Sequence, residues 1–418
     1  MIVLSQEQID AGRRPGRSQK LVLRSLDDGD AYSQIAPAGA GPPASCTLVF
    51  SGDPGSVDVN SFGAVDDVVR VIVGEEREDS CSGQGAPSGA PARGYVRRNR
   101  EWVESPVQIV PVKEEIFSRT RGLFETGVFR DACIFTAGLG SGGAPIVLEL
   151  AKLGLNQILL DFDRVEVGNV VRHAAGLSDV GRRKVNVLAE MVRDKNPYAD
   201  IEAHDMEIGW QNVDAVRDMV RRSNLVICAV DDHKARVILN KLCVEEDTPM
   251  IMAGCFRRAY AGQVLFVQPK VTPCYQCFMM TVPEKARDRE ISSARDAARI
   301  AYSDRPVAIE PGLSADIAPI SLMVVKLVIQ HLLKGKPTTL ESLNEDLAAP
   351  WYIWLNRREP GSQYEGLEPL QCNVDGMHVM RWYGIAMERD AGCPACGNFI
   401  EAALRAEGLE EPAGAKPQ

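Results

Sequence analysis

The chain lacks an excess of positive charge and lacks a long apolar run. Of its 418 residues, 57 are acidic and 47 are basic, which gives a formal net charge of −10. An acidic surface repels polyanions, so the composition argues against non-specific binding to nucleic acid. The most apolar stretch, IAPISLMVVKLVIQHLL, is interrupted by Pro319, Lys326 and His331. A membrane span needs roughly 18 or more apolar residues, so we expect no membrane partner and no nucleic-acid partner.

A secretion signal is also missing from the pattern, because MIVLSQEQIDAGRRPGR turns polar after four residues. We therefore expect a cytoplasmic protein, in which thiols stay reduced and paired cysteines indicate metal binding or catalysis. Histidine is scarce, with five residues, and four of them show no ligand spacing. His173 has two interpretations, since it follows an arginine that could contact a nucleotide but could equally serve packing or capping.

Three regions are expected from the chain's organisation. Residues 1–115 alternate short apolar runs with stretches rich in Gly, Ala, Pro and Ser, which predicts a small strand-containing accessory domain of unknown role. Residues 116–340 alternate strand and helix patterns, which predicts an α/β domain with a Rossmann-like, mostly parallel sheet and helices on both faces. Residues 341–418 are rich in aromatics and predict short strands.

The central region can be divided further into expected elements. Strands are expected at 132–137, 157–161, 199–204, 224–230, 250–254 and 262–267. Helices are expected at about 145–153, 182–195, 211–221, 233–246 and 314–333. The charged, weakly periodic residues 278–313 predict a flexible crossing loop.

A glycine-rich turn follows the first of these strands. GLGSGG fits the pattern G-x-G-x-x-G with Gly138, Gly140 and Gly143, and it stands between a strand and a helix as the motif requires. The glycines allow close backbone approach, and the helix N-terminus offers N–H donors to a phosphate. Asp161, at the end of the next strand, is placed to hold ribose hydroxyls. These features predict a nucleotide site without choosing between NAD and ATP.

Charged residues downstream favour ATP. Arg172 and Lys184 are suited to a reaction that drives pyrophosphate from ATP, in which negative charge develops on phosphate oxygens. Asp231 and Asp232 follow an apolar strand, at the edge where open α/β sheets bind ligands, so a carboxylate there could hold magnesium. Asp232 is also a good helix N-cap.

Together these motifs resemble the ThiF and MoeB type of adenylating enzyme, the family that includes ubiquitin-activating enzymes. The resemblance implies ATP- and Mg²⁺-dependent adenylation of the C-terminal glycine carboxylate of a ubiquitin-like or sulfur-carrier protein. It implies a homodimer, and a conjugating enzyme or a sulfur donor as a further partner. It also implies roles for individual residues: phosphate binding by Gly138, Gly140 and Gly143, ribose binding by Asp161, pocket formation by Asp163 and Asn169, phosphate stabilisation by Arg172 and Lys184, and magnesium binding by Asp231. Arg121, or less favourably Arg119, would reach the ATP of a partner subunit.

Two C-x-x-C pairs stand far apart in the chain. Cys274 and Cys277 form PCYQC, and Cys393 and Cys396 form CPAC. Two such pairs can close a tetrahedral Cys₄ zinc site, here one that ties the C-terminal segment to the adenylation domain. A redox pair is the alternative, disfavoured because neither pair opens a thioredoxin-like unit.

The crossing loop departs from the family pattern. Many relatives move the activated carboxyl onto a cysteine in this loop, but residues 278–313 contain none. Three outcomes stay open. The adenylate could pass directly to an acceptor; a hydroxyl could form an oxyester, with Ser303, Ser292 and Ser293 as candidates; or a cysteine elsewhere in the chain or on a partner could serve.

Two other functions remain as alternatives. An NAD-dependent oxidoreductase would explain Asp161 but leaves Arg172, Lys184 and Asp231 without a role. A catalytically inactive scaffold would keep the fold to bind a partner, but degenerate relatives usually lose such charged residues.

Overall fold

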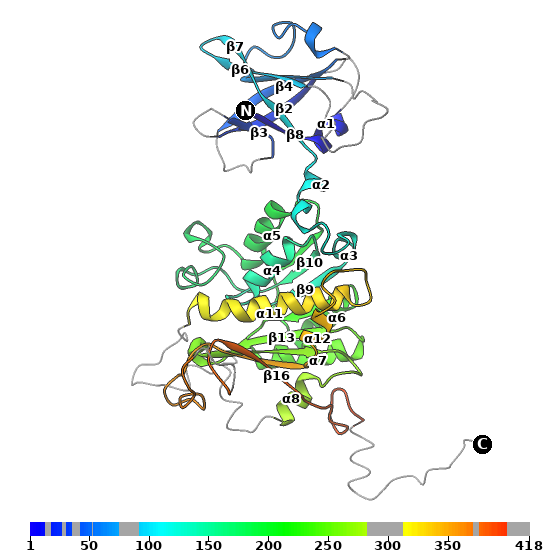
Figure 1. Cartoon of the computed structure of the whole chain (residues 1–418), viewed down its shortest axis with the longest axis vertical. Helices are drawn as coiled ribbons and strands as arrows, with labels where there is room; N and C mark the ends of the chain where they lie inside the picture. Colours follow the sequence, from blue (N-terminus) through cyan, green and yellow to red (C-terminus); the bar gives the residue numbers. More distant parts are fainter. Residues whose placement is uncertain are drawn as a thin grey trace, which may run out of the picture. The chain divides into compact units, whose positions relative to one another are not determined.

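The computed structural model describes residues 1–12, 18–26, 31–35, 42–51, 53–74, 92–281, 312–370 and 376–398. The chain divides into two compact units, Met1–Arg119 and Thr120–Gln418 (Figure 1). The division lies four residues after the boundary that the sequence suggested. Each unit has its own sheet and its own buried core.

The first unit is built on an eight-stranded sheet with the order β7-β6-β5-β4-β2-β3-β1-β8. Parallel and antiparallel pairings both occur in it. Its core is aliphatic, with Leu23, Leu48 and Val71 fully buried. Its elements are β1 (Ile2–Ser5), α1 (Gln6–Gly12), β2 (Ser18–Leu26), β3 (Ala31–Ser33), β4 (Pro43–Phe50), β5 (Val69–Val73), β6 (Ala92–Arg98), β7 (Glu101–Ser105), β8 (Val107–Val110) and α2 (Val112–Glu115).

The second unit is built on another eight-stranded sheet, with the order β11-β10-β9-β12-β13-β14-β15-β16. The first five of these strands run parallel, and β14, β15 and β16 add antiparallel pairings. The strands are β9 (Cys133–Ala137), β10 (Asn156–Leu160), β11 (Ile201–His204), β12 (Leu225–Cys228), β13 (Met250–Cys255), β14 (Ala261–Val267), β15 (Trp351–Leu355) and β16 (Arg381–Ile385).

This sheet is less parallel than the sequence predicted. Only residues 256–260 separate β13 from β14. Parallel neighbours need a crossover of a dozen or more residues. A connection of this length can therefore join only antiparallel strands. The two aromatic-rich strands β15 and β16 then extend the same sheet rather than forming one of their own.

Helices cover both faces of the sheet, as the sequence predicted. Alternate residues of β9 point to opposite faces, because strand side chains alternate. Phe135 packs with α6 (Val213–Arg221), α7 (His233–Glu245) and α8 (Tyr275–Thr281). Ile134 packs with α3 (Gly127–Arg130), α4 (Gly143–Ala151) and α11 (Ser314–Leu333) on the other face. Helix α5 (Lys184–Lys195) packs beside α4, and the short α12 (Leu343–Asp346) precedes β15.

Helix α11 passes along the sheet in the second unit (Figure 1). Within the described residues, it is the one helix that is long and apolar enough to cross a membrane. It packs on α4, β13 and β14, and Val324, Leu327 and Val328 are fully buried. Its apolar character therefore matches its place in the core of this unit.

The strand order creates a switch point between β9 and β12. From β9 the chain moves outward through β10 to β11, and it then returns to the other side of β9 with β12. Connections from these two neighbours consequently leave in opposite directions, and ligands of open α/β sheets bind at such points. The glycine turn follows β9 and Asp231 follows β12, so both lie at this edge.

Candidate functional site

The glycine turn fills the space between β9 and α4, and its glycines differ in what requires them. Gly138 has φ 87°, and a Cβ there would lie 2.6 Å from the carbonyl carbon of Ala229, just after β12. A Cβ on Gly143 would lie 1.9 Å from the Gly138 oxygen. Gly140, in contrast, has no described atom within 4 Å of a Cβ position. Two glycines thus satisfy internal packing, while Gly140 leaves an open side that a ligand can approach.

The peptide units of Leu139 are held from two sides. Its N–H donates to Asp161 Oδ2 at 2.6 Å, and its carbonyl oxygen lies 2.7 Å from His173 Nε2. The N–H of Ala175 donates to His173 Nδ1 at 3.0 Å, so the ring proton resides on Nε2 and is donated to Leu139. Asp161 also accepts from the N–H of Asp163 at 2.7 Å. Asp161 and His173 therefore fix the shape of the glycine turn.

His173 is accordingly a packing residue in the present structure, the second of its two interpretations. Its side chain is buried, and burial is the main cause that lowers its pKa, with Lys184 acting in the same direction. A neutral imidazole suits its hydrogen bonds, because protonation would place a donor against the Ala175 N–H.

Lys184 and Asp163 form an ion pair beside the turn. Their Nζ and Oδ2 atoms are 2.8 Å apart, and the Lys184 backbone N–H also donates to the Asp163 carbonyl at 3.1 Å. Lys184 is buried, whereas the side chain of Asp163 is half exposed. The pair presents one cation and one anion at the start of α5, with the lysine held firmly in place.

Asp231 stands just after β12, within the electrostatic field of this pair. Burial is the main cause that raises its pKa, and Asp163 acts in the same direction. Arg236 and Lys184 partly offset this rise. The residue still reaches solvent, as a ligand of an incoming cation must. Asp232 caps α7 through a 2.7 Å bond from the Ala235 N–H, as the sequence predicted.

Asn169 and Arg172 lie in the segment after β10. Asn169 Oδ1 accepts from the N–H of Glu166 at 3.1 Å and so closes a short turn. Arg172 is half-buried, and its Nη1 lies 3.9 Å from a Cβ position on Gly312, near the end of the crossing loop. The end of that loop therefore passes beside Arg172.

Arg121 lies just before the segment that pairs with the chain after α11. Leu123 and Phe124 pair with the segment after α11, at Thr338 and Thr339. The other end of α11 meets the glycine turn, where Ser321 donates to the Gly142 carbonyl at 2.9 Å. Since 12 residues of α11 separate Ser321 from Leu333, roughly 18 Å of helix intervenes. A role for Arg121 or Arg119 at a partner's ATP stays a prediction.

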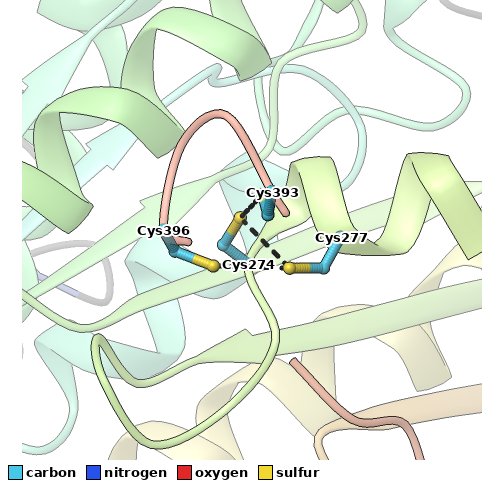
Figure 2. Close-up of side chains that lie close together, drawn as sticks. All are labelled: Cys274, Cys277, Cys393 and Cys396. Atoms are coloured by element: carbon cyan, nitrogen blue, oxygen red, sulfur yellow. Dashed lines mark hydrogen bonds between the residues drawn. The ribbon is translucent and has the colours of Figure 1, made fainter. Parts of the chain in front are cut away.

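The four predicted metal ligands meet in one cluster (Figure 2). All four sulfur atoms lie within 4.8 Å of one another, and Cys274 is 3.9 Å from Cys277 and 3.6 Å from Cys393. Cys277 is 3.3 Å from Cys396. A tetrahedral zinc with bonds of about 2.3 Å has sulfur–sulfur edges of roughly 3.8 Å, whereas a disulfide bond is about 2.05 Å long. The four thiols fit a metal better than they fit a disulfide.

Other contacts hold the C-terminal pair beside α8. Arg389 donates to the carbonyl of Lys270 at 2.8 Å and to that of Cys396 at 2.6 Å. The N–H of Asp390 donates to the Cys277 sulfur at 3.4 Å. The turn that carries Cys393 and Cys396 is thus fixed beside α8.

Several cysteines outside the cluster are ordinary core residues. Cys46 and Cys228 are buried, and Cys243 is buried in α7. Cys133 and Cys255 are half-buried. Cys81 and Cys372, and the candidate serines Ser292, Ser293 and Ser303, lie outside the described residues.

Two buried polar residues of α7 were not predicted from the sequence. Arg236 is buried in α7, and its Nε donates at 3.0 Å to the carbonyl of Val230, which directly precedes Asp231. Asn240, one turn further along, is also fully buried. A signal was available, because polar side chains at 232, 236 and 240 repeat every four residues and so share one face of the helix.

The sequence matches the ThiF family over residues 124–348. Ubiquitin-like modifier-activating enzyme 5 of Caenorhabditis elegans is 26% identical over 176 residues, covering 38% of this chain and 42% of that protein. SAMP-activating enzyme E1 of Haloferax volcanii is 30% identical over 153 residues, covering 36% and 54%. A crystal structure of E. coli MccB matches with a TM-score of 0.47 and 19% identity, covering 65% of this chain and 68% of that one.

The chain spans about half the length of these two curated relatives. The family match, in contrast, extends over more than half of the chain and contains the glycine turn, the Lys184–Asp163 pair, Asp231 and the first cysteine pair. The chain belongs to the ThiF family.

Proposed function

We propose that this chain adenylates the C-terminal glycine carboxylate of a ubiquitin-like or sulfur-carrier protein, using ATP and Mg²⁺ and releasing pyrophosphate. One observation carries the proposal. The glycine turn and Asp231 follow neighbouring strands at the switch point of the sheet, and Lys184 is close enough to Asp231 to affect its pKa. The names of the relatives support the kind of substrate, because two of them activate a ubiquitin-like modifier or SAMP.

The turn would hold the phosphates of ATP. Its open side at Gly140 and the N-terminus of α4 offer backbone N–H donors. Asp161 and His173 hold the turn in one conformation before ATP binds. Less conformational entropy is therefore lost when ATP binds. Asp161 uses both carboxylate oxygens for backbone N–H groups, and each oxygen keeps a second lone pair for a ribose hydroxyl.

Adenylation joins a carboxylate oxygen to the α-phosphorus and breaks the bond from that phosphorus to the bridging oxygen. Negative charge grows on the departing pyrophosphate. Lys184 and Arg172 would stabilise this charge, Lys184 from a buried position where its field is strongest. Asn169 would shape the nucleotide pocket between them.

Asp231 would hold the magnesium ion that accompanies ATP. A carboxylate oxygen is a suitable ligand, and Asp231 reaches solvent at the ligand-binding edge of the sheet. The ion supplies neutralisation of phosphate charge. A raised pKa also suits the role, since the carboxylate is poorly compensated within the protein and gains a counter-ion with the substrate.

The cysteine cluster would bind structural zinc. Its four protein thiols leave no coordination position for a substrate, so the metal would fasten the C-terminal segment and take no part in adenylation. The observed sulfur separations fit this geometry without large movement.

The acyl group would then pass directly from the adenylate to an acceptor, such as a sulfur donor or a conjugating enzyme. Residues 278–313 contain no cysteine, which supports direct transfer. An oxyester on a loop serine, or a thioester on a cysteine elsewhere or on a partner, would give a carrier linked covalently to protein.

A homodimer would complete the site if Arg121 reaches the ATP of a second copy. The segment after β10 exposes large apolar side chains beside Arg172, which supports a protein partner at this surface. Val167, Val171 and Leu177 are 65%, 82% and 71% exposed.

The products of ATP test this function. The purified protein is incubated with Mg²⁺, ATP and a peptide or carrier ending in Gly-Gly. Release of AMP and pyrophosphate, with an adenylated carrier in the mass spectrum, is expected. Release of ADP and phosphate, or no turnover with any carboxylate-terminated carrier, would contradict the proposal. Treatment of any protein-linked carrier with thiol reductant and with mild base then separates a thioester from an oxyester.

A further inference from the structure

Helix α7 joins the adenylation edge of the sheet to the cysteine cluster. Its first turn follows Asp231 and Asp232, and its third turn carries Asn240, which is fully buried. Asn240 Oδ1 accepts from the backbone N–H of Tyr275 at 2.8 Å. Tyr275 directly follows Cys274 and begins α8. A buried asparagine on one helix therefore holds the first turn of α8, which carries Cys277 and directly follows Cys274.

The other half of the Asn240 amide has no such partner. Its Nδ2 atom is buried and donates to no acceptor within the described part of the chain. Burial is the main cause that raises the pKa of the Cys274 thiol, and the backbone N–H of Cys277 and the Asn240 side chain act against that rise. Because Asn240 Oδ1 binds the N–H of Tyr275, its amide lies beside Cys274, the residue that directly precedes Tyr275.

A buried donor without an acceptor destabilises the folded protein, because the donor has lost its hydrogen bonds to water. The nearby Cys274 sulfur becomes a much better acceptor when it is a thiolate, because a charged acceptor strengthens the hydrogen bond. Zinc binding requires the deprotonated thiolate. Metal binding would therefore give the Asn240 Nδ2 donor an acceptor.

We propose that Asn240 is a positioning residue of the cysteine cluster, which donates from Nδ2 to the zinc-bound Cys274 thiolate while Oδ1 holds the Tyr275 N–H. This inference rests on the proposal that the cluster binds zinc. Four thiolates around one Zn²⁺ carry a net charge of about −2, and N–H donors disperse it. Asp390 supplies such a donor to Cys277 from its backbone, and Asn240 would supply one to Cys274 from its side chain.

One substitution separates this role from simple packing. Asn240→Asp keeps an oxygen for the Tyr275 N–H but replaces the donor with a second oxygen and adds negative charge. If Asn240 served only Tyr275, the variant would hold zinc as well as the wild type. If Nδ2 donates to Cys274, the variant should release zinc to a chromogenic chelator about 10- to 100-fold faster.

Asn356→Asp is the matched control. Asn356 is also a buried amide, and its Nδ2 donates at 2.7 and 2.8 Å to the carbonyls of Ala259 and Asp316. The same exchange of atoms there should lower thermal stability but leave the rate of zinc release unchanged. Faster release from both variants would indicate a general loss of stability and would overturn the proposal.

Zinc content of the full-length wild type is measured first, by elemental analysis. Absence of zinc would contradict the proposed zinc site itself. Zinc in the wild type with unchanged release from Asn240→Asp would overturn only the role of Asn240. If that variant does not fold, the wild type loaded with ¹¹³Cd provides a second measurement: a scalar coupling between the metal and the Asn240 amide protons is expected, and its absence while backbone N–H couplings are seen would contradict the proposal.

Discussion

His173 Nε2 donates to the carbonyl oxygen of Leu139 across a distance of 2.7 Å. A side chain from the segment after β10 thereby fixes the turn after β9. The same peptide segment is held on its N–H side by Asp161. In our account, the phosphate-binding turn is set before the nucleotide arrives, and its stiffness depends on these two contacts.

Loss of the His173 contact should weaken nucleotide binding. His173→Ala removes one buried hydrogen bond and is expected to raise KM for ATP about 5- to 10-fold, with a smaller effect on kcat. His173→Gln retains an N–H donor at similar reach and should recover most of the affinity. Steady-state kinetics of pyrophosphate release measures both. Equal KM values for all three proteins would show that the turn does not need this contact.

Stability should fall in mildly acidic solution. Burial lowers the pKa of His173 and of His331 in the folded state, whereas the unfolded chain binds these protons near pH 6.5. Below that pH the unfolded state holds more protons, so the free energy of unfolding decreases until the lower, folded pKa is reached. Denaturant unfolding between pH 7.5 and 5 measures the slope. His331→Phe, which cannot titrate, should show a smaller slope; an unchanged slope in this variant would contradict the assignment.

Asp231 should be required for adenylation but not for the stability of the fold. Burial raises its pKa, so its negative charge costs the folded state free energy relative to the unfolded chain. Asp231→Ala is therefore expected to lower adenylation by at least about 100-fold while leaving the melting temperature unchanged or higher. Asp232→Ala is the neighbouring control, because it removes an N-cap and should cost about 1 kcal/mol with adenylation retained. The reverse pattern would mean that the catalytic carboxylate is Asp232.

The C-terminal cysteine pair should contribute to the stability of the second unit. Cys393→Ser removes one of four thiols from the cluster and is expected to abolish stoichiometric zinc and lower the melting temperature by at least about 5 °C. Cys133→Ser changes a half-buried thiol outside the cluster and should retain zinc. Differential scanning calorimetry with elemental analysis compares them. Full zinc content in Cys393→Ser would exclude the four-thiol site.

Local sequence patterns predicted much of the second unit. The strands around Phe135 and the helix that begins after Asp232 follow from apolar periodicity and a capping residue, which act over a few neighbouring positions. The two C-x-x-C pairs also predicted that the four cysteines lie together, because two such pairs typically bind one metal ion. The strand β14 was predicted, but its antiparallel direction was not. The direction of a strand depends on the length of its connection rather than on its side chains.

Roles that depend on long-range contact could not be read from the chain. His173 meets Leu139 from 34 positions away, and Asn240 meets Tyr275 from 35 positions away. The polar positions of α7 repeat, but the partner of each residue cannot be identified from spacing, because it depends on how two loops or helices pack after the sheet has formed. The spacing of Arg121 likewise does not reveal what its side chain meets in an assembly.

ATP–pyrophosphate exchange tests the central claim most directly, since it reports reversible formation of an acyl-adenylate without needing the later acceptor. Labelled pyrophosphate should enter ATP only when Mg²⁺ and a carrier or peptide with a free Gly-Gly carboxylate are both present. Amidation of that carboxylate, or Asp231→Ala in the enzyme, should reduce exchange at least about 100-fold. Exchange that is independent of the carboxylate, or no exchange across a panel of ubiquitin-like and sulfur-carrier proteins, would contradict the account.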